Sequence, residues 1–374
     1  MKKIILTGVV LLNSILCLSQ DAKAYYELIN KGQNHLIEND LSSSLISYGD
    51  AFELFNYPFY KHIKQAALVA LFNDNEKLLK KYLTKCVEKG MLRNELQYFI
   101  NKDKSNVSKN ILLEYGQLRP LFLESIDSTM LHHFMELDML DSYSNPLSYK
   151  NDNESLETHR RQQVKIMNSY VNLIDSLGYP SESNVGHARI YYKLENETGC
   201  RWDDCFKYCM KYYNDVHFSN ENLTVITAEE KSGRKLESVR PGNSFIWHYH
   251  GGVRNDSSLL RVLNAGFEKL KVAPSNIIVY YESLQELKHD FCGTYVSKTY
   301  MEEARSKSGR YHLSDTIKKT INKNRLKYYI LPLEMEEQLI MSLYKIEHGK
   351  SIKKVNEKSL KKIDFLYYTF ISLN

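Results

Sequence analysis

The sequence has 374 residues, of which 43% are hydrophobic and 25% charged, and its formal net charge is +5. This length can bury a sizeable core but exceeds one compact unit, so two domains are expected. Six cysteines do not make a disulfide scaffold, and beyond the first twenty residues no apolar stretch approaches the roughly 20 residues of a membrane span.

The first twenty residues have the order of a secretory signal peptide. Two lysines precede an apolar run, Ile4–Leu12, and Cys17 and Ser19 stand at the two small-residue positions of a cleavage site before Gln20. Cleavage after Ser19 would remove residues 1–19 and make Gln20 the first residue of the mature chain. We therefore predict an exported protein, in the periplasm or outside the cell. Acylation of Cys17 is the alternative, and we favour cleavage because the leucine before it is bulky where a lipidation site has a small residue.

Residues 20–100 predict a series of packed helices. Apolar residues recur every three or four positions in two segments, which places each set on one helix face. The sets are Ile63, Ala66, Ala67, Ala70 and Leu71, and Leu78, Leu79, Tyr82, Leu83, Cys86 and Val87. Helices stacked on helices are the expected result.

An earlier helix pair carries a more specific pattern. Gly32, Ser44, Tyr48 and Ala51 follow one another at spacings of twelve, four and three residues. Over Tyr25–Pro58 this resembles the tetratricopeptide repeat, in which a small residue lets two helices approach and an aromatic residue fills the gap beyond. Ser44 stands where the repeat usually has alanine. The resemblance implies that residues 20–100 form a tetratricopeptide-like helical region, in which this unit has degenerate neighbours.

Residues 101–154 predict a linker and a helical connector. The polar segment Asn101–Lys109 is expected to be a linker, and a second polar stretch, Ser142–Glu154, contains Pro146. The segment between the two has the pattern of an amphipathic helix.

The clearest helix is predicted from Ser155 to Leu177. Its apolar side chains share one face, namely Val164, Met167, Tyr170, Val171, Ile174 and Leu177. Gly178 then supplies a left-handed cap, and Pro180 prevents the helix from resuming.

A motif follows this helix. Gly178-Tyr179-Pro180-Ser181 and Asn184-Val185-Gly186, within the segment Thr129–Tyr213, resemble a family of uncharacterised secreted bacterial proteins with tetratricopeptide-like helices. Members commonly have a histidine and a glutamine shortly after the last glycine, and here His187 is the only histidine nearby. The resemblance brings no known activity.

Residues 155–374 are expected to form a mostly helical C-terminal domain. Leu223–Ile226, Phe245–Tyr249 and Ile277–Tyr281 fit either short strands or buried helix turns, and both alternatives stay open. The predicted fold class is therefore mainly α, with tetratricopeptide-like repeats followed by this second domain.

The sharpest catalytic hypothesis rests on His248 and His250. Alternate residues of a strand point to the same face, so the two rings could bind one zinc ion and leave a water for hydrolysis. Asp256, Glu282 or His289 would be the third ligand. On a helix the two rings would diverge and the site would vanish. We favour hydrogen-bonded structural histidines, so neither a catalytic residue nor a cofactor is predicted.

Removal of the signal leaves five cysteines, an odd number that cannot all pair within one chain. Cys200 and Cys292 are the candidate pair for one disulfide. Cys205 and Cys209 stand one helical turn apart near Cys200 and could bind a soft metal. Their stripe with Trp202 fits a buried core instead, because free cysteine packs like a small hydrophobic side chain.

The stretch from Arg305 to Lys362 is rich in lysine and arginine. Clustered cations could bind an anionic polymer, a membrane surface or nucleic acid. Acidic residues interleave with the basic ones at Glu334, Glu336, Glu337, Glu347 and Glu357. We favour ordinary solvated helix faces because the charges are mixed, and nucleic acid is not expected as the partner of an exported protein.

The leading prediction is an exported helical-repeat protein that binds a protein or peptide partner without catalysis. It rests on the signal, the tetratricopeptide-like helix pair and 28 tyrosines, whose rigid rings with polar tips suit concave binding surfaces. A metal-dependent hydrolase built on His248 and His250 is the first alternative. A structural component of the cell envelope is the second.

Overall fold

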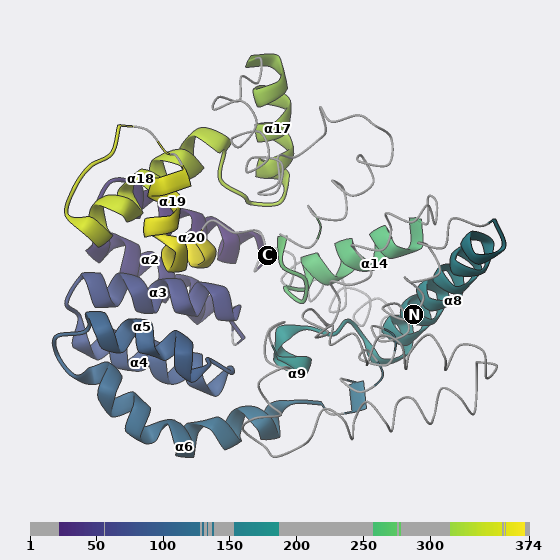
Figure 1. The fold of residues 1–374 in the computed structure, drawn as a ribbon, viewed down its shortest axis with the longest axis horizontal. Helices are drawn as coiled ribbons and strands as arrows, with labels where there is room; N and C mark the ends of the chain where they lie inside the picture. The colour runs from purple at the N-terminus through teal and green to yellow at the C-terminus, as the bar shows by residue number, and fades with distance from the viewer. Residues whose placement is uncertain are drawn as a thin grey trace, which may run out of the picture. The chain divides into compact units, whose positions relative to one another are not determined.

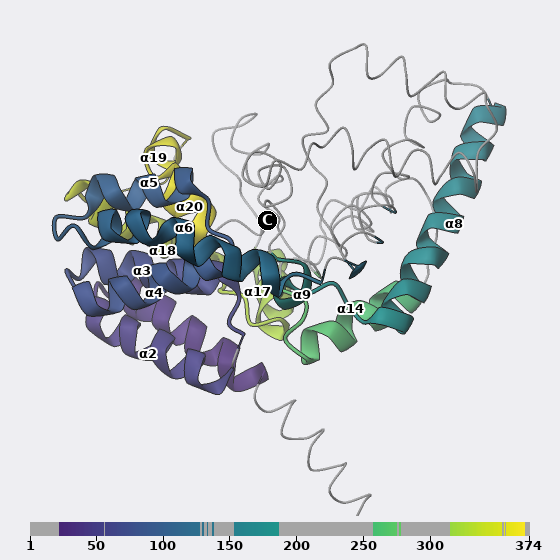
Figure 2. The same ribbon diagram turned by 90° about the horizontal axis from the view of Figure 1, so that it is seen from below.

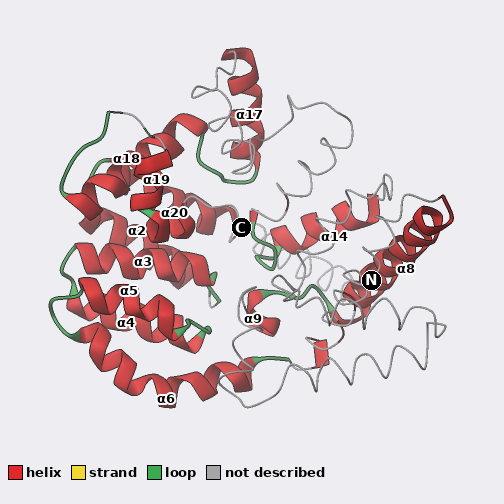
Figure 3. Ribbon diagram, viewed as in Figure 1, coloured by secondary structure: helices red, strands yellow, loops and turns green. Residues whose placement is uncertain are grey.

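The computed structural model of the chain is built from α-helices (Figure 3). It describes residues 22–55, 57–127, 129–130, 133, 137, 153–186, 257–274, 277, 315–353, 355 and 357–370. In these residues there is no β-strand, and no helix is long and apolar enough to cross a membrane. The predicted mainly α fold class is confirmed, whereas the tetratricopeptide-like character of the N-terminal helices stays a prediction.

The chain divides into two compact units. Unit 1 takes the chain up to Glu124 and again from Leu263 onward, and unit 2 takes Ser125–Val262. Unit 1 therefore joins N-terminal helices to C-terminal helices, which the sequence placed in separate regions, 20–100 and 155–374.

Consecutive helices form the N-terminal part of unit 1. They are residues 22–37, α2 (Leu41–Leu54), α3 (Tyr60–Phe72), α4 (Glu76–Glu88), α5 (Arg93–Lys102) and α6 (Val107–Ser125). In Figure 1 α2 and α3 lie above α4 and α5, and α6 lies below them. α3 packs on both α2 and α4 and is buried along most of its length, so it is the central helix of this stack.

The C-terminal part of unit 1 packs on the same stack. Its helices are the end of α14 (Ser257–Glu268), α17 (Asp315–Lys327), α18 (Leu333–His348), α19 (Glu357–Lys362) and α20 (Asp364–Phe370). One apolar cluster contains buried side chains from both parts, for example Ile63 and Leu83 from the first and Leu343 and Leu366 from the second. α20 contacts α3, and both views show it beside the N-terminal stack (Figures 1 and 2).

Short polar side chains fix where two of the helices begin. Asp40 accepts a hydrogen bond from the Ser43 amide at the start of α2. Asn75 accepts one from the Leu78 amide at the start of α4. Both bonds satisfy amides that have no partner inside the helix, so the helix starts are encoded locally.

The segment Asn101–Lys109, predicted as a linker, is helical at both ends. Only residues 103–106 form a loop between α5 and α6. Asp103 accepts hydrogen bonds from the Ser105 and Ser108 amides at 2.8 and 2.7 Å, which begins α6 inside the predicted linker. The polar residues of this segment therefore cap the start of α6 and form a loop of four residues between the two helices.

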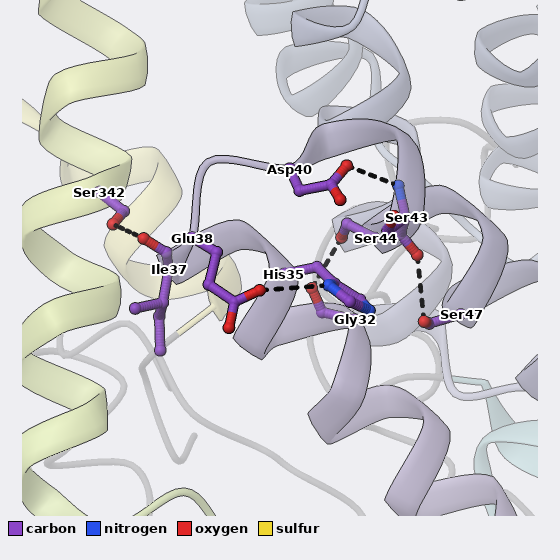
Figure 4. Close-up of polar contacts among 9 residues, drawn as sticks. All are labelled: Gly32, His35, Ile37, Glu38, Asp40, Ser43, Ser44, Ser47 and Ser342. Carbon is purple, nitrogen blue, oxygen red and sulfur yellow. Dashed lines mark hydrogen bonds and ion pairs between the residues drawn. The ribbon is translucent and has the colours of Figure 1, made fainter.

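The crossing of the first two helices has the close approach that the sequence predicts. Ser44 Oγ donates a hydrogen bond of 2.8 Å to the Gly32 carbonyl oxygen (Figure 4). A Cβ atom on Gly32 would lie 3.1 Å from Cε2 of Tyr48, whose ring is fully buried, so a larger residue would push the helices apart. In the same view Ser342 of α18 donates a hydrogen bond of 3.1 Å to the Ile37 carbonyl oxygen. This bond attaches the C-terminal part of unit 1 to the end of the first helix.

Unit 2 contains a long helix, α8 (Asn153–Leu177), and a short one, α9 (Glu182–Val185). Gly178 adopts a φ of +88° directly after α8, and its amide donates a hydrogen bond of 2.8 Å to the Ile174 carbonyl oxygen. The predicted left-handed cap is therefore confirmed.

The buried face of α8 differs in part from the predicted one, because it includes Ile166 and leaves out Val164 and Leu177. Its buried side chains are Ile166, Met167, Tyr170, Val171 and Ile174. Val164 and Leu177, which were expected on this face, are 45% and 42% exposed. Val164 lies at the edge of the buried stripe, given the helical repeat of 3.6 residues, and Leu177 is the last residue of the helix.

Candidate partner-binding face

The residues that the sequence singles out for chemistry or processing lie outside the described part of the chain. They are Ser19, Gln20, Cys200, His248, His250 and Cys292. The cleavage, disulfide and zinc assignments therefore stay predictions. Within the described ranges, no group of three or more His, Cys, Asp or Glu side chains could hold a metal ion.

Polar and aromatic contacts between distant parts of the chain gather where α20 and the end of α18 meet α3 and α5. We call the α3 and α5 side of this contact the receiving face. Its members are Lys64 and Gln65 of α3 and Glu95, Tyr98 and Lys102 of α5. Because α3 and α5 contact each other in unit 1, these side chains belong to one surface.

Gln65 is a fully buried amide near the middle of α3. Its Oε1 accepts a hydrogen bond of 3.0 Å from the Tyr48 hydroxyl and a longer one of 3.4 Å from Nε2 of Gln33. Its Nε2 donates a hydrogen bond of 2.9 Å to the main-chain oxygen of Thr369. That oxygen lies in the last turn of α20, where carbonyl groups lack partners within the helix. Gln65 therefore binds the end of α20 and links it to the first helix and α2.

Phe365 of α20 contacts both an aromatic ring and a cation. Its ring stacks on that of Tyr98, with centroids 4.0 Å and planes 11° apart, and meets the Phe99 ring edge on. Nζ of Lys64 lies 4.3 Å from the Phe365 ring centroid, within range of a cation–π interaction. The receiving face thus binds an aromatic ring and, four residues later, the carbonyl group of a helix end.

Lys64 and Glu95 form an ion pair within the receiving face. Nζ of Lys64 lies 2.8 Å from Oε1 of Glu95, and the two side chains are only 11% and 21% exposed. Oε2 of Glu95 accepts hydrogen bonds from the Tyr60 hydroxyl at 3.0 Å and from the Leu92 amide at 3.2 Å. Both charges keep partners inside the N-terminal stack, which offsets part of the cost of removing them from water.

The end of α18 adds a second charged contact. Glu347 accepts a hydrogen bond from the Tyr98 hydroxyl and pairs with Nζ of Lys102, each at 2.5 Å, and its side chain is 7% exposed. Burial and the bond to Glu347 raise the pKa of Tyr98, so its hydroxyl stays a donor. The prediction that the acidic residues of this stretch are solvated is wrong for Glu347. It is also wrong for Glu336, which pairs with the buried Arg325.

A second cluster, of aromatic side chains, attaches the first helix to its neighbours. The Tyr25 hydroxyl accepts a hydrogen bond from the Phe59 amide at 3.3 Å and lies 2.7 Å from Nδ1 of His62. Burial lowers the pKa of His62 to about 3, so the ring is neutral and Nδ1 can accept the Tyr25 proton. Next to it, the Tyr26 ring stacks on that of Tyr329 with centroids 5.6 Å apart. This cluster therefore holds the first helix against its neighbours.

One signal for the receiving face was present in the sequence. Lys64 and Gln65 interrupt the apolar pattern of α3, whose apolar positions were assigned to a helix–helix core. Buried polar side chains need partners, so two of them inside an apolar helix mark a place where another element attaches. The identity of that element could not be read from spacing, because Phe365 and Thr369 lie far along the chain.

Comparisons of the chain with protein-family models, with curated proteins and with solved structures find no match. The family resemblance drawn from the motif Gly178 to Gly186 therefore stays a prediction. A helical fold by itself is compatible with many functions.

Proposed function

We propose that this protein is exported and binds a protein or peptide partner through the receiving face, without catalysing a reaction. The observation that carries the proposal is the attachment of α20, a helix of seven residues from a distant part of the chain, to that face. Helical stacks offer extended surfaces of this kind without any catalytic group. Export rests on the signal pattern of residues 1–19.

The chemistry of the receiving face suits a short helix. Gln65 donates to a main-chain oxygen, so this contact does not depend on the side chain that the partner presents there. Tyr98 and Lys64 contact one aromatic ring, and an aromatic anchor surrounded by polar contacts is the usual form of a binding hot spot. The face therefore accepts any side chain at the end of the bound helix but requires an aromatic ring against Tyr98 and Lys64.

A labelled peptide with the sequence of residues 357–370 tests the proposal. The full chain carrying Phe365→Ala, in which the internal helix is weakened, is titrated with the peptide, and fluorescence anisotropy reports binding. We expect saturable binding that is lost when Tyr98→Ala is added. Leu113→Ala, at an exposed position of α6, is the matched control and should leave binding unchanged. Binding that does not saturate, or saturable binding that persists when Tyr98→Ala is added, would overturn the proposal.

Two alternatives predicted from the sequence rest on residues outside this face. A hydrolase built on His248 and His250 requires stoichiometric zinc in the purified protein, and the double variant His248→Ala, His250→Ala should lose it. A structural envelope component would remain in the envelope fraction without saturable binding of the peptide. Metal analysis and the peptide titration therefore separate the three functions.

A further inference from the structure

We propose that α20 is an internal competitor that closes the receiving face, so that a partner binds only when α20 has left it. The inference rests on the proposed function and adds to it a mode of regulation and the chemistry of the partner. That partner is a short amphipathic helix. It places an aromatic ring against Tyr98 and Lys64 and a carbonyl group of its last turn against Gln65.

The polar groups of the receiving face stay satisfied when α20 leaves. Lys64 keeps its ion pair with Glu95, and Glu95 keeps its bonds to the Tyr60 hydroxyl and the Leu92 amide. Gln65 keeps the Tyr48 hydroxyl on its Oε1, and its Nε2 can turn to water in place of α20. Removal of α20 therefore leaves no buried charge without a partner. An unpaired buried charge would make the open state very unfavourable.

The central helix of the N-terminal stack, α3, keeps packing partners when α20 leaves. α3 is held by α2 on one side and α4 on the other, and both contacts lie within the N-terminal part of unit 1. α20 itself has seven residues, and isolated helices shorter than about 12 residues are marginal in water. The segment that must leave is thus a helix whose structure depends on its neighbours.

The contacts of α20 are also of the kind that a partner can replace. A main-chain hydrogen bond, a ring stack and a cation over a ring are all reproduced by another helix with an aromatic residue four positions before its end. Besides these contacts, α20 buries Leu366 and Phe370 in the apolar cluster of unit 1, so a replacing helix must be amphipathic.

Tethering gives α20 an advantage over any free partner. A segment joined to its own binding surface acts at an effective concentration of about 1 mM for a short flexible link. A free helix can bind only those molecules whose face is open. Its apparent affinity for the intact chain is therefore its intrinsic affinity reduced by the fraction of molecules with an open face. Weakening α20 should increase that fraction and the apparent affinity together.

The test compares the full wild-type chain with the full chain carrying Phe365→Ala. Both are titrated with the labelled peptide of residues 357–370. We expect the variant to bind at least about tenfold more tightly, because the substitution removes the ring on Tyr98 from the internal helix while the peptide keeps its own Phe365. Leu326→Ala, at an exposed position of α17, is the matched control and should bind as the wild type does.

A second measurement does not depend on the variant being folded. Amide hydrogen exchange of the wild-type chain is followed with and without a saturating amount of the unlabelled peptide, and we expect faster exchange in residues 364–370 when the peptide is bound. Equal affinities in the two chains, or unchanged exchange in α20 with bound peptide, would overturn internal competition while leaving the proposed function intact. No binding to either chain would overturn the proposed function itself.

Discussion

Gln65 of α3 donates a hydrogen bond of 2.9 Å to the main-chain oxygen of Thr369, although the two residues are 304 positions apart in the sequence. The bond connects the centre of the N-terminal stack to the last helix of the described chain. It lies in a fully buried site, where an unpaired amide or carbonyl group is costly. The stability of unit 1 should therefore respond to this one side chain.

We expect Gln65→Met to destabilise unit 1 by about 2–4 kcal/mol, because it leaves the Thr369 oxygen and the Tyr48 hydroxyl without their partner. Tyr48→Phe is the control, since it removes one donor from Gln65 but keeps the contact with Thr369. Its cost should be nearer 1 kcal/mol. Urea unfolding followed by circular dichroism gives both values. Equal costs would mean that the bond to α20 contributes nothing.

Two glycines allow a paired test of the helix crossing. Gly32→Ala should destabilise unit 1 by about 1–3 kcal/mol, because the new Cβ would lie 3.1 and 3.2 Å from ring carbons of Tyr48. Tyr48 cannot easily move, since it is fully buried and bonded to Gln65. Gly116→Ala in α6 meets no atom within 4 Å and should stabilise by about 0.5–1 kcal/mol through helix propensity. Thermal unfolding midpoints should therefore shift in opposite directions.

A buried and an exposed ion pair of unit 1 should differ in energy. Glu95→Gln leaves the Lys64 ammonium largely buried without its counter-charge, and we expect a loss of about 2 kcal/mol or more. Glu114→Gln removes the partner of Lys80 in an exposed pair, and the loss should stay below about 0.5 kcal/mol. Adding Lys64→Met to Glu95→Gln should recover part of the stability. Similar losses for the two single variants would contradict the buried pairing.

His62 should make unit 1 sensitive to acid. Its pKa is lowered from the usual 6.5 to about 3 by burial first and by the charge of Lys61 second. The unfolded chain therefore binds a proton that the folded chain rejects, so the stability is complete above pH 6.5 and is lost progressively as the pH falls toward 3. The slope should approach about 1.4 kcal/mol per pH unit inside that window.

His62→Gln tests whether His62 causes this acid sensitivity, because it removes the titrating group. The free energy of unfolding of the variant should change little between pH 6 and pH 4. His348→Gln, at an exposed position of α18, is the matched control and should keep the slope. Urea midpoints measured across the window give the comparison. A slope that persists in His62→Gln would assign the acid sensitivity to other groups.

Local patterns predicted much of the helical structure. The resemblance of Gly32, Ser44 and Tyr48 to the tetratricopeptide repeat implied a close helix crossing, and the hydrogen bond from Ser44 to Gly32 is formed at such a crossing. Gly178 was predicted to cap α8 and has the positive φ that such a cap requires. These features depend on residues within a few turns of one another, so the order of side chains along the chain is enough to encode them.

Charge patterns were less informative. Glu347 stands among lysines on a helix that reads as solvated, yet it is buried between Tyr98 and Lys102 of α5. A carboxylate on a helix looks the same in the sequence whether water or a distant lysine satisfies it. The difference depends on which helix packs beside it, and no spacing along α18 contains that information.

The sequence by itself determined that this chain is mainly helical, where several helices begin and end, and which of their faces are apolar. Only the tertiary structure decided that the C-terminal helices join the N-terminal stack and that α20 covers Lys64, Gln65 and Tyr98. The physical reason is the separation along the sequence of the residues that interact. Helix periodicity and capping arise between residues a few positions apart, whereas the choice of packing partner depends on shape and hydrogen-bonding groups from segments hundreds of residues away.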